Sequence, residues 1–281
     1  MTEAPATWEL SGRTLSLSRP LIMGILNVTP DSFSDGNRYF STGVAVERAL
    51  QMVEEGADII DIGGESTRPG APEVSEAEEL SRVLPVVQAL SGKVQAPISV
   101  DTYKAAVARA ACAAGAEIIN DVSAFSFDPA MASVAADAGA GVVLMHTRGR
   151  PDSMQKDTGY ADLINEVRES LAASLAAAVA AGVKPERIVL DPGIGFGKGA
   201  EGNLELIRRL GEFLPLGRPL LIGPSRKSFI GRILGRETGE RVFGTAAAVA
   251  VGLINGASIF RVHDVAAMRD VVDLTRALTA S

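Results

Sequence analysis

Short apolar runs alternate along the chain with longer segments whose apolar residues recur at helical spacing. Continuous apolar strands separated by helices are typical of a parallel sheet that is covered on both faces. Eight such units in about 250 residues predict a closed (β/α)8 TIM barrel, with a doubly wound open sheet as the alternative. The expected strands are residues 21–27, 57–63, 96–101, 116–121, 141–146, 187–193, 218–225 and 258–263. The expected helices include residues 44–55, 76–90, 103–114 and 160–181.

The start of the chain differs from these repeating units. Polar and apolar residues alternate over residues 7–18 and turn at Ser11-Gly12, which predicts a short β-hairpin ahead of the barrel. No linker or low-complexity segment divides the 281 residues, so we expect one domain that spans residues 1–281.

Composition and charge narrow the class of partner. Lys and Arg number 27 against 34 Asp and Glu, and this net charge of −7 argues against nucleic acid or an anionic membrane. No apolar run approaches the roughly 20 residues that cross a bilayer, and residues 1–12 lack the blocks of a secretory signal. The single cysteine, Cys112, lies in an Ala-rich helical pattern and is predicted to be a reduced core thiol. We therefore expect a cytoplasmic protein.

Nearly every predicted strand delivers a polar or ionisable residue at its carboxyl end. In a parallel barrel these ends lie on one face, the face that holds the active site. Any one of them alone can be a turn residue or a helix cap, but so many around one ring predict a ligand rich in donors and acceptors. The residues are Asn27, Asp61, Asp101, Asn120, Met145, His146, Asp191, Ser225, Lys227, Arg261 and His263.

Basic residues in three segments predict a phosphate or diphosphate pocket, with a set of surface ion pairs as the alternative. Arg261 and His263 are two apart on a strand and therefore share a face. Lys227 lies at the expected start of a helix, where backbone N–H groups favour an anion. Arg68 follows the pair Gly63-Gly64, which makes its segment a candidate mobile loop.

Asp101, Asp191 and Asn120 allow two interpretations. They suit a general acid/base pair, and they equally suit a planar ring with amide and amine edges. Two histidines cannot form a three-His zinc site, so a hard cation such as Mg²⁺, held by Asn27, loop oxygens and phosphate, is favoured. The segment "DPGIGFGKG" matches no nucleotide-binding motif and predicts a turn that lets Phe196 approach a ligand.

Two long segments, "GILNVTPDSFSDG" and "DIGGESTRPGA", closely resemble the signatures of the dihydropteroate synthase family. The blocks "SVDTYK", "IINDVSA", "VLMH", "LDPGIGFGK", "GPSRKSFIG" and "FRVHDV" resemble its remaining motifs in the same order, from about Leu21 to the C-terminus. The resemblance implies a (β/α)8 barrel that condenses 6-hydroxymethyl-7,8-dihydropterin diphosphate with 4-aminobenzoate. It also implies a sulfonamide target in folate biosynthesis that forms a homodimer.

The resemblance further implies a role for each matching position. The pterin ring would be held by Asp101, Asn120, Met145, Asp191 and Lys227. Diphosphate would meet Thr67, Arg68, Arg261 and His263. The 4-aminobenzoate pocket would comprise Phe33, Pro69, Phe196, Lys227 and Ser228. Mg²⁺ would be bound by Asn27, joined by Asp35 when residues 28–40 close as a lid.

Three other functions remain as alternatives at this point. A pterin-dependent methyltransferase on a related barrel would keep the carboxylates but would not need the "TPDSFSDG" and "STRPG" loops. A catalytically silent pterin-binding homologue typically loses loop residues that this chain retains. A phosphosugar lyase or aldolase would need a Schiff-base lysine on a strand or a histidine metal cluster, and neither is evident.

Overall fold

The computed structural model describes residues 5–29, 38–68 and 70–279. Phe33, Asp35 and Pro69 lie outside the described residues, so their expected roles stay predictions. Within the described ranges, no helix is both long and apolar enough to cross a bilayer.

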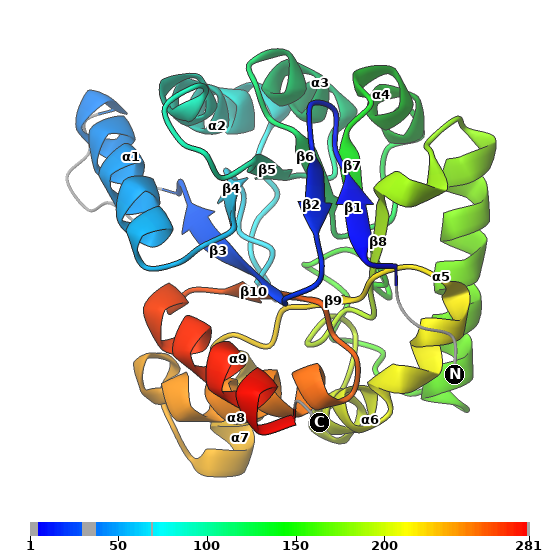
Figure 1. The fold of residues 1–281 in the computed structure, drawn as a ribbon. Helices are drawn as coiled ribbons and strands as arrows, with labels where there is room; N and C mark the ends of the chain where they lie inside the picture. The colour runs from blue at the N-terminus through cyan, green and yellow to red at the C-terminus, as the bar shows by residue number, and fades with distance from the viewer. Residues whose placement is uncertain (1–4, 30–37, 69, 280–281) are drawn as a thin grey trace.

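Eight parallel strands form the barrel that the apolar runs predict (Figure 1). Neighbouring strands follow the order β8-β7-β6-β5-β4-β3-β10-β9. A parallel bridge between Leu190 and Leu220, with the Leu190 N–H 3.0 Å from the Pro219 carbonyl oxygen, joins the two ends of this order. The sheet is therefore a closed barrel and not an open doubly wound sheet. The strands are β3 (Leu21–Asn27), β4 (Ile59–Gly63), β5 (Ile98–Asp101), β6 (Ile118–Asp121), β7 (Gly141–Met145), β8 (Ile188–Asp191), β9 (Leu221–Ile222) and β10 (Ile259–Val262).

Helices surround the strands as an outer layer (Figure 1). Short 3₁₀ segments occur at Pro185–Arg187, Leu210–Leu216 and Thr238–Glu240. The α-helices are α1 (Arg38–Glu54), α2 (Glu76–Leu90), α3 (Ala105–Ala113), α4 (Met131–Ala138), α5 (Leu163–Ala180), α6 (Ala200–Arg208), α7 (Ser228–Leu234), α8 (Val242–Ile254) and α9 (Val265–Thr279).

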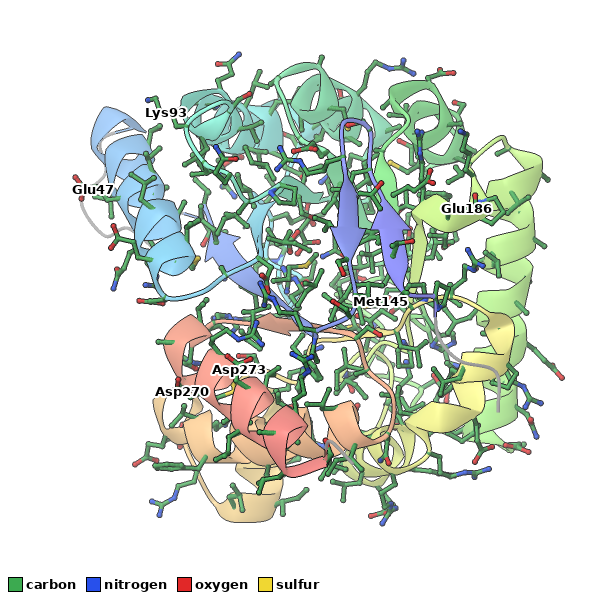
Figure 2. The ribbon with its side chains drawn as sticks, viewed as in Figure 1. Glu47, Lys93, Met145, Glu186, Asp270 and Asp273 are labelled. Atoms are coloured by element: carbon green, nitrogen blue, oxygen red, sulfur yellow. The ribbon has the colours of Figure 1, made fainter. Side chains whose placement is uncertain are left out.

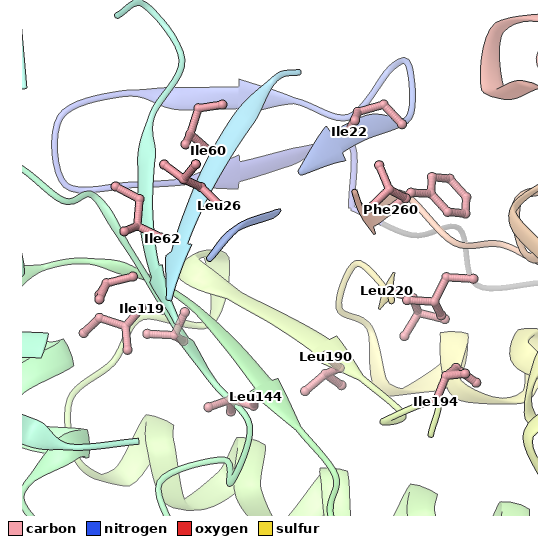
Figure 3. Packing of buried hydrophobic residues seen from close by; sticks show 14 of the residues in the cluster. Ile22, Leu26, Ile60, Ile62, Ile119, Leu144, Leu190, Ile194, Leu220 and Phe260 are labelled. Carbon is pink, nitrogen blue, oxygen red and sulfur yellow. The ribbon is translucent and has the colours of Figure 1, made fainter. Parts of the chain in front are cut away.

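The strands are mainly apolar because both of their faces are buried, and their polar residues lie toward their carboxyl ends. Ile22, Leu26, Ile60 and Phe260 belong to the layer between strands and helices, part of which is seen in Figure 3. The alternate positions fill the amino-terminal end of the barrel interior. They are Leu21, Met23, Ile59, Ile118, Val143, Val189, Leu221 and Ile259.

The predicted hairpin closes this amino-terminal end. Strands β1 (Thr7–Glu9) and β2 (Thr14–Ser16) pair antiparallel, and Trp8 and Leu10 pack on the interior cluster. Gly141 makes room for them, since a Cβ there would lie 2.4 Å from Leu10 Cδ2. With this end plugged, a ligand enters the barrel from the carboxyl ends of the strands.

Replacing Trp8 with phenylalanine should lower the free energy of unfolding by about 1–3 kcal/mol. Trp8 is fully buried, and its Nε1–H donates to the Arg187 carbonyl oxygen at 2.8 Å, so the change removes volume and orphans an acceptor. Urea unfolding followed by circular dichroism measures the loss. An unchanged midpoint would show that the hairpin does not contribute to barrel stability.

Seven of the eight strands are shorter than the apolar runs suggest, and β9 and β8 lose the most residues. β9 covers only Leu221–Ile222 of the predicted 218–225, since Pro219 and Pro224 have no N–H to donate to a ladder. β8 ends at Asp191, directly before Pro192 and the glycine-rich loop. Both shortened ends leave irregular backbone on the face where the polar residues gather.

Candidate active site

Buried carboxylates and an amide line the carboxyl-terminal part of the barrel. The strand registers set Asp61 beside Ser99 and Asp101 beside Asn120, and Asp191 pairs with Met145 across β7 and β8. Asp61, Asp101, Asn120 and Asp191 are each at most 6% exposed. The structure therefore brings together Asp101, Asn120 and Asp191 as the strand ends predict, and places Asp61, another of the strand-end residues, beside them.

Arg261 ties two of these carboxylates together. Its Nε donates to Asp61 Oδ2 at 2.6 Å, and its second terminal nitrogen donates to Asp101 Oδ2, also at 2.6 Å. Asn120 Nδ2 donates to the same Asp61 oxygen at 3.1 Å. Burial raises the pKa of Asp101 to about 7, and the positive charge of Arg261 opposes that rise.

Three buried oxygens inside the barrel find no hydrogen-bond partner among the described residues: Asp61 Oδ1, Asp101 Oδ1 and Ser99 Oγ. Ser99 and Asp101 are two apart on β5 and share its inner face. Unpaired buried acceptors are costly, so this cluster suits a ligand with several N–H donors along one edge. Of the two interpretations left open for the carboxylates, the planar ring fits this arrangement better.

Asp191 and Lys227 face the same space from the far side of the barrel. Asp191 Oδ1 accepts from the Gly193 N–H at 2.7 Å, and burial raises the pKa of Asp191. Lys227 donates to the Ile194 carbonyl oxygen, and its Nζ lies 4.3 Å from the Phe196 ring centroid. Burial lowers the pKa of Lys227 to about 7, although Asp191 favours the charged form.

Met145 and Phe196 belong to one apolar wall beside these charges, together with Tyr103, Val122 and Met154. Figure 2 shows Met145 near the centre of the molecule, whereas Glu47, Lys93 and Glu186 lie at its periphery. An apolar wall next to a polar edge suits a flat heterocycle that stacks on one face and hydrogen-bonds along its rim.

His263 is not the cation that the sequence analysis counted. Burial, with the nearby charges of Arg261 and Arg226, lowers the pKa of His263 to about 3, so the ring is neutral at pH 7. The His263 backbone N–H donates to Ser225 Oγ at 3.1 Å, which leaves the hydroxyl proton for Nδ1, 2.9 Å away. When the hydroxyl donates to Nδ1, the ring proton lies on Nε2, which is then a neutral hydrogen-bond donor.

The segment that carries Lys227 starts a helix, as the sequence predicts. Helix α7 begins at Ser228, Lys227 is its N-cap residue, and Arg226 has a left-handed φ of 56°. Arg226 Nε donates to Asp264 Oδ2 at 2.9 Å, so this cation is already neutralised. Ser225 and Arg226 therefore form the turn that aims Lys227 into the barrel, and not the first turn of a helix.

Arg48 is a cation near the site that the sequence analysis did not single out. It lies on α1, pairs with Glu55 at 2.7 Å and donates to the His263 carbonyl oxygen at 3.4 Å. Asn27, Arg48, Arg226 and His263 line a cavity of about 240 Å³ together with Ile25, Leu26 and Met52. Nothing in the helical pattern of 44–55 indicates which polar residue turns toward the strand ends.

The loop after β4 is anchored at its first residues. Glu65 accepts from the Tyr103 hydroxyl at 2.6 Å and from Lys104, which also donates to Glu79 at 2.6 Å. Gly64 is needed for packing, since a Cβ there would lie 2.8 Å from Val83 Cγ2. The glycines themselves therefore belong to the anchored part of this segment, and the mobility expected of the loop that carries Arg68 stays a prediction.

Thr67 and Arg68 follow this anchor, half-buried and exposed respectively. The Arg68 charge contributes to the lowered pKa of His263, which brings the loop and the end of β10 into one electrostatic environment. Ser228 lies exposed at the start of α7, next to Lys227.

Asn27 ends β3 and is the residue expected to bind Mg²⁺. No group of three His, Cys, Asp or Glu able to hold a metal occurs among residues 5–29, 38–68 and 70–279. A single amide oxygen fits Mg²⁺ only where phosphate oxygens and water complete the shell, which is how this ion is commonly bound. The donor set is thus compatible with an ion that arrives with a diphosphate.

Cys112 lies on α3 as a half-buried free thiol that packs against the core. Burial raises its pKa to about 11, so it is protonated at neutral pH and a poor nucleophile. This agrees with the predicted structural role.

A family model for pterin binding enzymes matches residues 23–263 of the chain. A curated dihydropteroate synthase from Synechocystis sp. is 52% identical over 261 residues, which cover 92% of this chain and 90% of the relative. The Yersinia pestis dihydropteroate synthase, solved as a sulfonamide drug complex, aligns with a TM-score of 0.93 at 44% identity, over 98% of this chain and 100% of that one. The Xanthomonas albilineans dihydropteroate synthase solved with 4-aminobenzoic acid gives a TM-score of 0.92 at 45% identity, over 98% and 99%.

The chain therefore belongs to the pterin-binding enzymes. Within that class, its sequence identity to curated relatives over nearly the whole chain makes it a member of the dihydropteroate synthase family. The members of this family are transferases of a pterinylmethyl group. The resemblance drawn from the sequence motifs is confirmed, as is the barrel. The individual roles assigned to site residues stay predictions.

Proposed function

We propose that this protein joins 6-hydroxymethyl-7,8-dihydropterin diphosphate to 4-aminobenzoate, giving 7,8-dihydropteroate and diphosphate in folate biosynthesis. The observation that carries the proposal is the set of unpaired buried oxygens on Asp61, Ser99 and Asp101 inside the barrel. A dihydropterin offers an exocyclic amine and ring N–H groups as donors to such acceptors. Membership of the dihydropteroate synthase family supports the same substrate.

In the proposed complex the pterin edge bonds to Asp101, Asn120 and Asp191, and Met145 packs on the ring. The Lys227 ammonium donates to the pterin carbonyl and also borders the 4-aminobenzoate pocket beside Phe196 and Ser228, the pocket that sulfonamides would share. The contacts of Lys227 with the Ile194 carbonyl oxygen and the Phe196 ring support this double role.

The reaction breaks the bond between the pterin methylene carbon and a diphosphate oxygen, and diphosphate leaves with the electron pair. Thr67, Arg68 and Arg261 would stabilise the charge that grows on it, and His263 would donate from Nε2. The aniline nitrogen of 4-aminobenzoate then forms the new carbon–nitrogen bond and releases a proton. Mg²⁺, held by Asn27 and diphosphate oxygens, would supply further positive charge to the leaving group.

We infer that diphosphate leaves before the aniline attacks. The electron-rich dihydropterin supports a cation at the departing carbon, and an aniline is a modest nucleophile that needs no strong base. Single-turnover rates with ring-substituted anilines test this order. Rates that change little with aniline basicity support it, and a steep dependence contradicts it.

Calorimetric titration with 6-hydroxymethyl-7,8-dihydropterin diphosphate and Mg²⁺ tests the proposed site directly. We expect one molecule bound per chain, and weaker binding when EDTA removes the metal. A protein that does not bind this compound is not a dihydropteroate synthase. A protein that binds it with no turnover is a silent homologue.

The same proposal includes a homodimer. Large apolar side chains are exposed on α7, α8 and α9, which lie together in Figure 1, and Phe243 on α8 is 84% exposed. Exposed apolar patches of this kind mark association surfaces. The other side chains of this patch are Ile233, Leu234, Val251, Ile254, Leu274 and Leu278.

Replacing Phe243 with glutamate should convert the protein to a monomer, because the dimer would then bury an unpaired charge. Analytical ultracentrifugation is expected to give twice the chain mass of 29.2 kDa for the wild type and the single chain mass for the variant. Leu50→Glu, on α1, is the matched control and should remain dimeric. A monomeric wild type would refute the proposed dimer.

A cytoplasmic location completes the proposal. The chain has one cysteine and therefore no internal disulfide, as is usual for proteins of reducing compartments.

A further inference from the structure

The loop between β8 and α6, residues 192–199, has no regular secondary structure. Almost every backbone carbonyl oxygen in it nevertheless accepts a hydrogen bond. Gln155 binds the Gly195 oxygen at 2.9 Å, and Tyr160 binds the Gly197 oxygen at 3.0 Å. Lys227 binds the Ile194 oxygen, and the Gly193 oxygen accepts from the Phe196 N–H. A loop of three glycines with positive φ would otherwise be free to sample many conformations.

Lys198 is the internal tie of this loop. It is 3% exposed, and its Nζ lies 2.8 Å from the Phe196 carbonyl oxygen, 3.3 Å from the His146 carbonyl oxygen and 2.9 Å from His146 Nδ1. The chain thus turns back over the side-chain nitrogen of Lys198. Burial lowers the pKa of Lys198 well below its usual value, and the carboxylate of Asp191, at the end of β8, opposes that fall.

Asn203 closes the loop from α6. It is 2% exposed, its Oδ1 accepts from the Gly195 N–H at 2.5 Å, and its Nδ2 donates to the oxygens of Gly199 at 2.8 Å and Lys198 at 3.2 Å. Together, Lys198 and Asn203 fix the Phe196 backbone, whose ring lies under Lys227.

We propose that Lys198 and Asn203 are positioning residues that set the 4-aminobenzoate pocket by fixing Phe196 and the Ile194 carbonyl against Lys227. The inference rests on the proposed function and goes beyond it, since neither residue touches a substrate in that proposal. The proposal predicts a larger effect on the KM for 4-aminobenzoate than on the KM for the pterin diphosphate. The pterin edge is held mainly at the ends of β5, β6 and β8, which, among the described residues, meet this loop only where the Gly193 N–H donates to Asp191 and where Lys227 donates to the Ile194 carbonyl oxygen.

The close fit of the loop supports a single permitted position. A Cβ on Gly193 would lie 1.9 Å from the His146 oxygen, and one on Gly195 would lie 2.6 Å from Lys227 Cδ. The loop backbone therefore already contacts both neighbours at Gly193 and Gly195, so a displacement of the loop would change its contacts with His146 and Lys227.

The test compares Lys198→Met and Asn203→Ala with Asn255→Ala. Asn255 also binds two successive carbonyl oxygens, those of Ile207 and Arg208, but lies far along the chain from this loop. We expect the KM for 4-aminobenzoate to rise about tenfold or more in the first two variants, with less than about a threefold change in the KM for the pterin diphosphate. The control should change neither. Equal increases in both KM values, or none, would overturn the proposal.

Hydrogen exchange of residues 193–199 gives a readout that does not depend on turnover. It should accelerate about tenfold or more in Asn203→Ala and stay unchanged in Asn255→Ala. Asn203→Ala keeps the buried lysine, so it remains informative if Lys198→Met does not fold. Unchanged exchange refutes the positioning role, whereas an inactive wild type with accelerated exchange in the variant refutes only the proposed function.

Discussion

Replacing Asp191 with asparagine is expected to lower kcat/KM for the pterin diphosphate by about 10- to 150-fold. A hydrogen bond to a charged group is worth about 1.5–3 kcal/mol, and each 1.4 kcal/mol is a factor of ten. Asp191 is buried at the end of β8, with one oxygen bound to the Gly193 N–H, so the other is available to a ligand donor. The amide keeps the shape of the side chain and removes the charge that attracts that donor.

Steady-state kinetics with saturating 4-aminobenzoate measure this loss. Asp162→Asn is the matched control, because Asp162 caps α5 at the surface and asparagine caps helices equally well. The control should retain wild-type kinetics. An Asp191→Asn enzyme with normal kcat/KM would remove Asp191 from the pterin site.

Replacing Arg261 with methionine is expected to lower the free energy of unfolding by about 3–5 kcal/mol at pH 8 and to abolish activity. The arginine is the partner of two buried carboxylates, Asp61 and Asp101, which methionine leaves uncompensated. Each of these carboxylates already has one oxygen with no hydrogen-bond partner among the described residues. No further donor there is therefore at hand to replace the arginine.

The loss of unfolding free energy in the Arg261→Met variant should become smaller as the pH falls. Burial already raises the pKa of Asp101 to about 7, and losing Arg261 removes the charge that opposes that rise. Between about pH 4 and the raised pKa, the native variant then binds more protons than the unfolded chain. A fall in pH therefore stabilises the native variant, because protonation removes the repulsion between the carboxylates of Asp61 and Asp101. We therefore expect a smaller loss at pH 5 than at pH 8.

Urea unfolding at the two pH values measures both effects. Arg209→Met is the control, since Arg209 pairs with Glu205 and Glu212 at the surface and its loss should cost at most about 1 kcal/mol. Equal stability losses for the two arginine variants would show that Arg261 is not the partner on which the buried carboxylates depend.

The repeating pattern of the chain was enough to predict the barrel, because each strand is buried on both faces and each helix on one. The eight predicted strands all contain an observed one, and the largest errors in their bounds fall beside prolines, as at Pro219 and Pro192. The strand ends likewise predicted Asp101, Asn120 and Asp191, since strand registers fix which residues meet across neighbouring strands.

Residues outside the strands were harder to assign. Arg48, Lys104 and Lys198 look like ordinary polar positions in sequence, and only the packing of separate elements turns them toward buried partners. The charge of His263 was also wrongly predicted. Its pKa depends on burial and on neighbouring arginines that come from other segments.

The central claim is the condensation itself, and turnover tests it most directly. Purified protein is mixed with 6-hydroxymethyl-7,8-dihydropterin diphosphate, 4-aminobenzoate and Mg²⁺, with EDTA in a parallel reaction, and both products are quantified. We predict that 7,8-dihydropteroate and diphosphate form in equal amounts and only when the metal is present. Binding of the pterin diphosphate without formation of either product would contradict the proposed function.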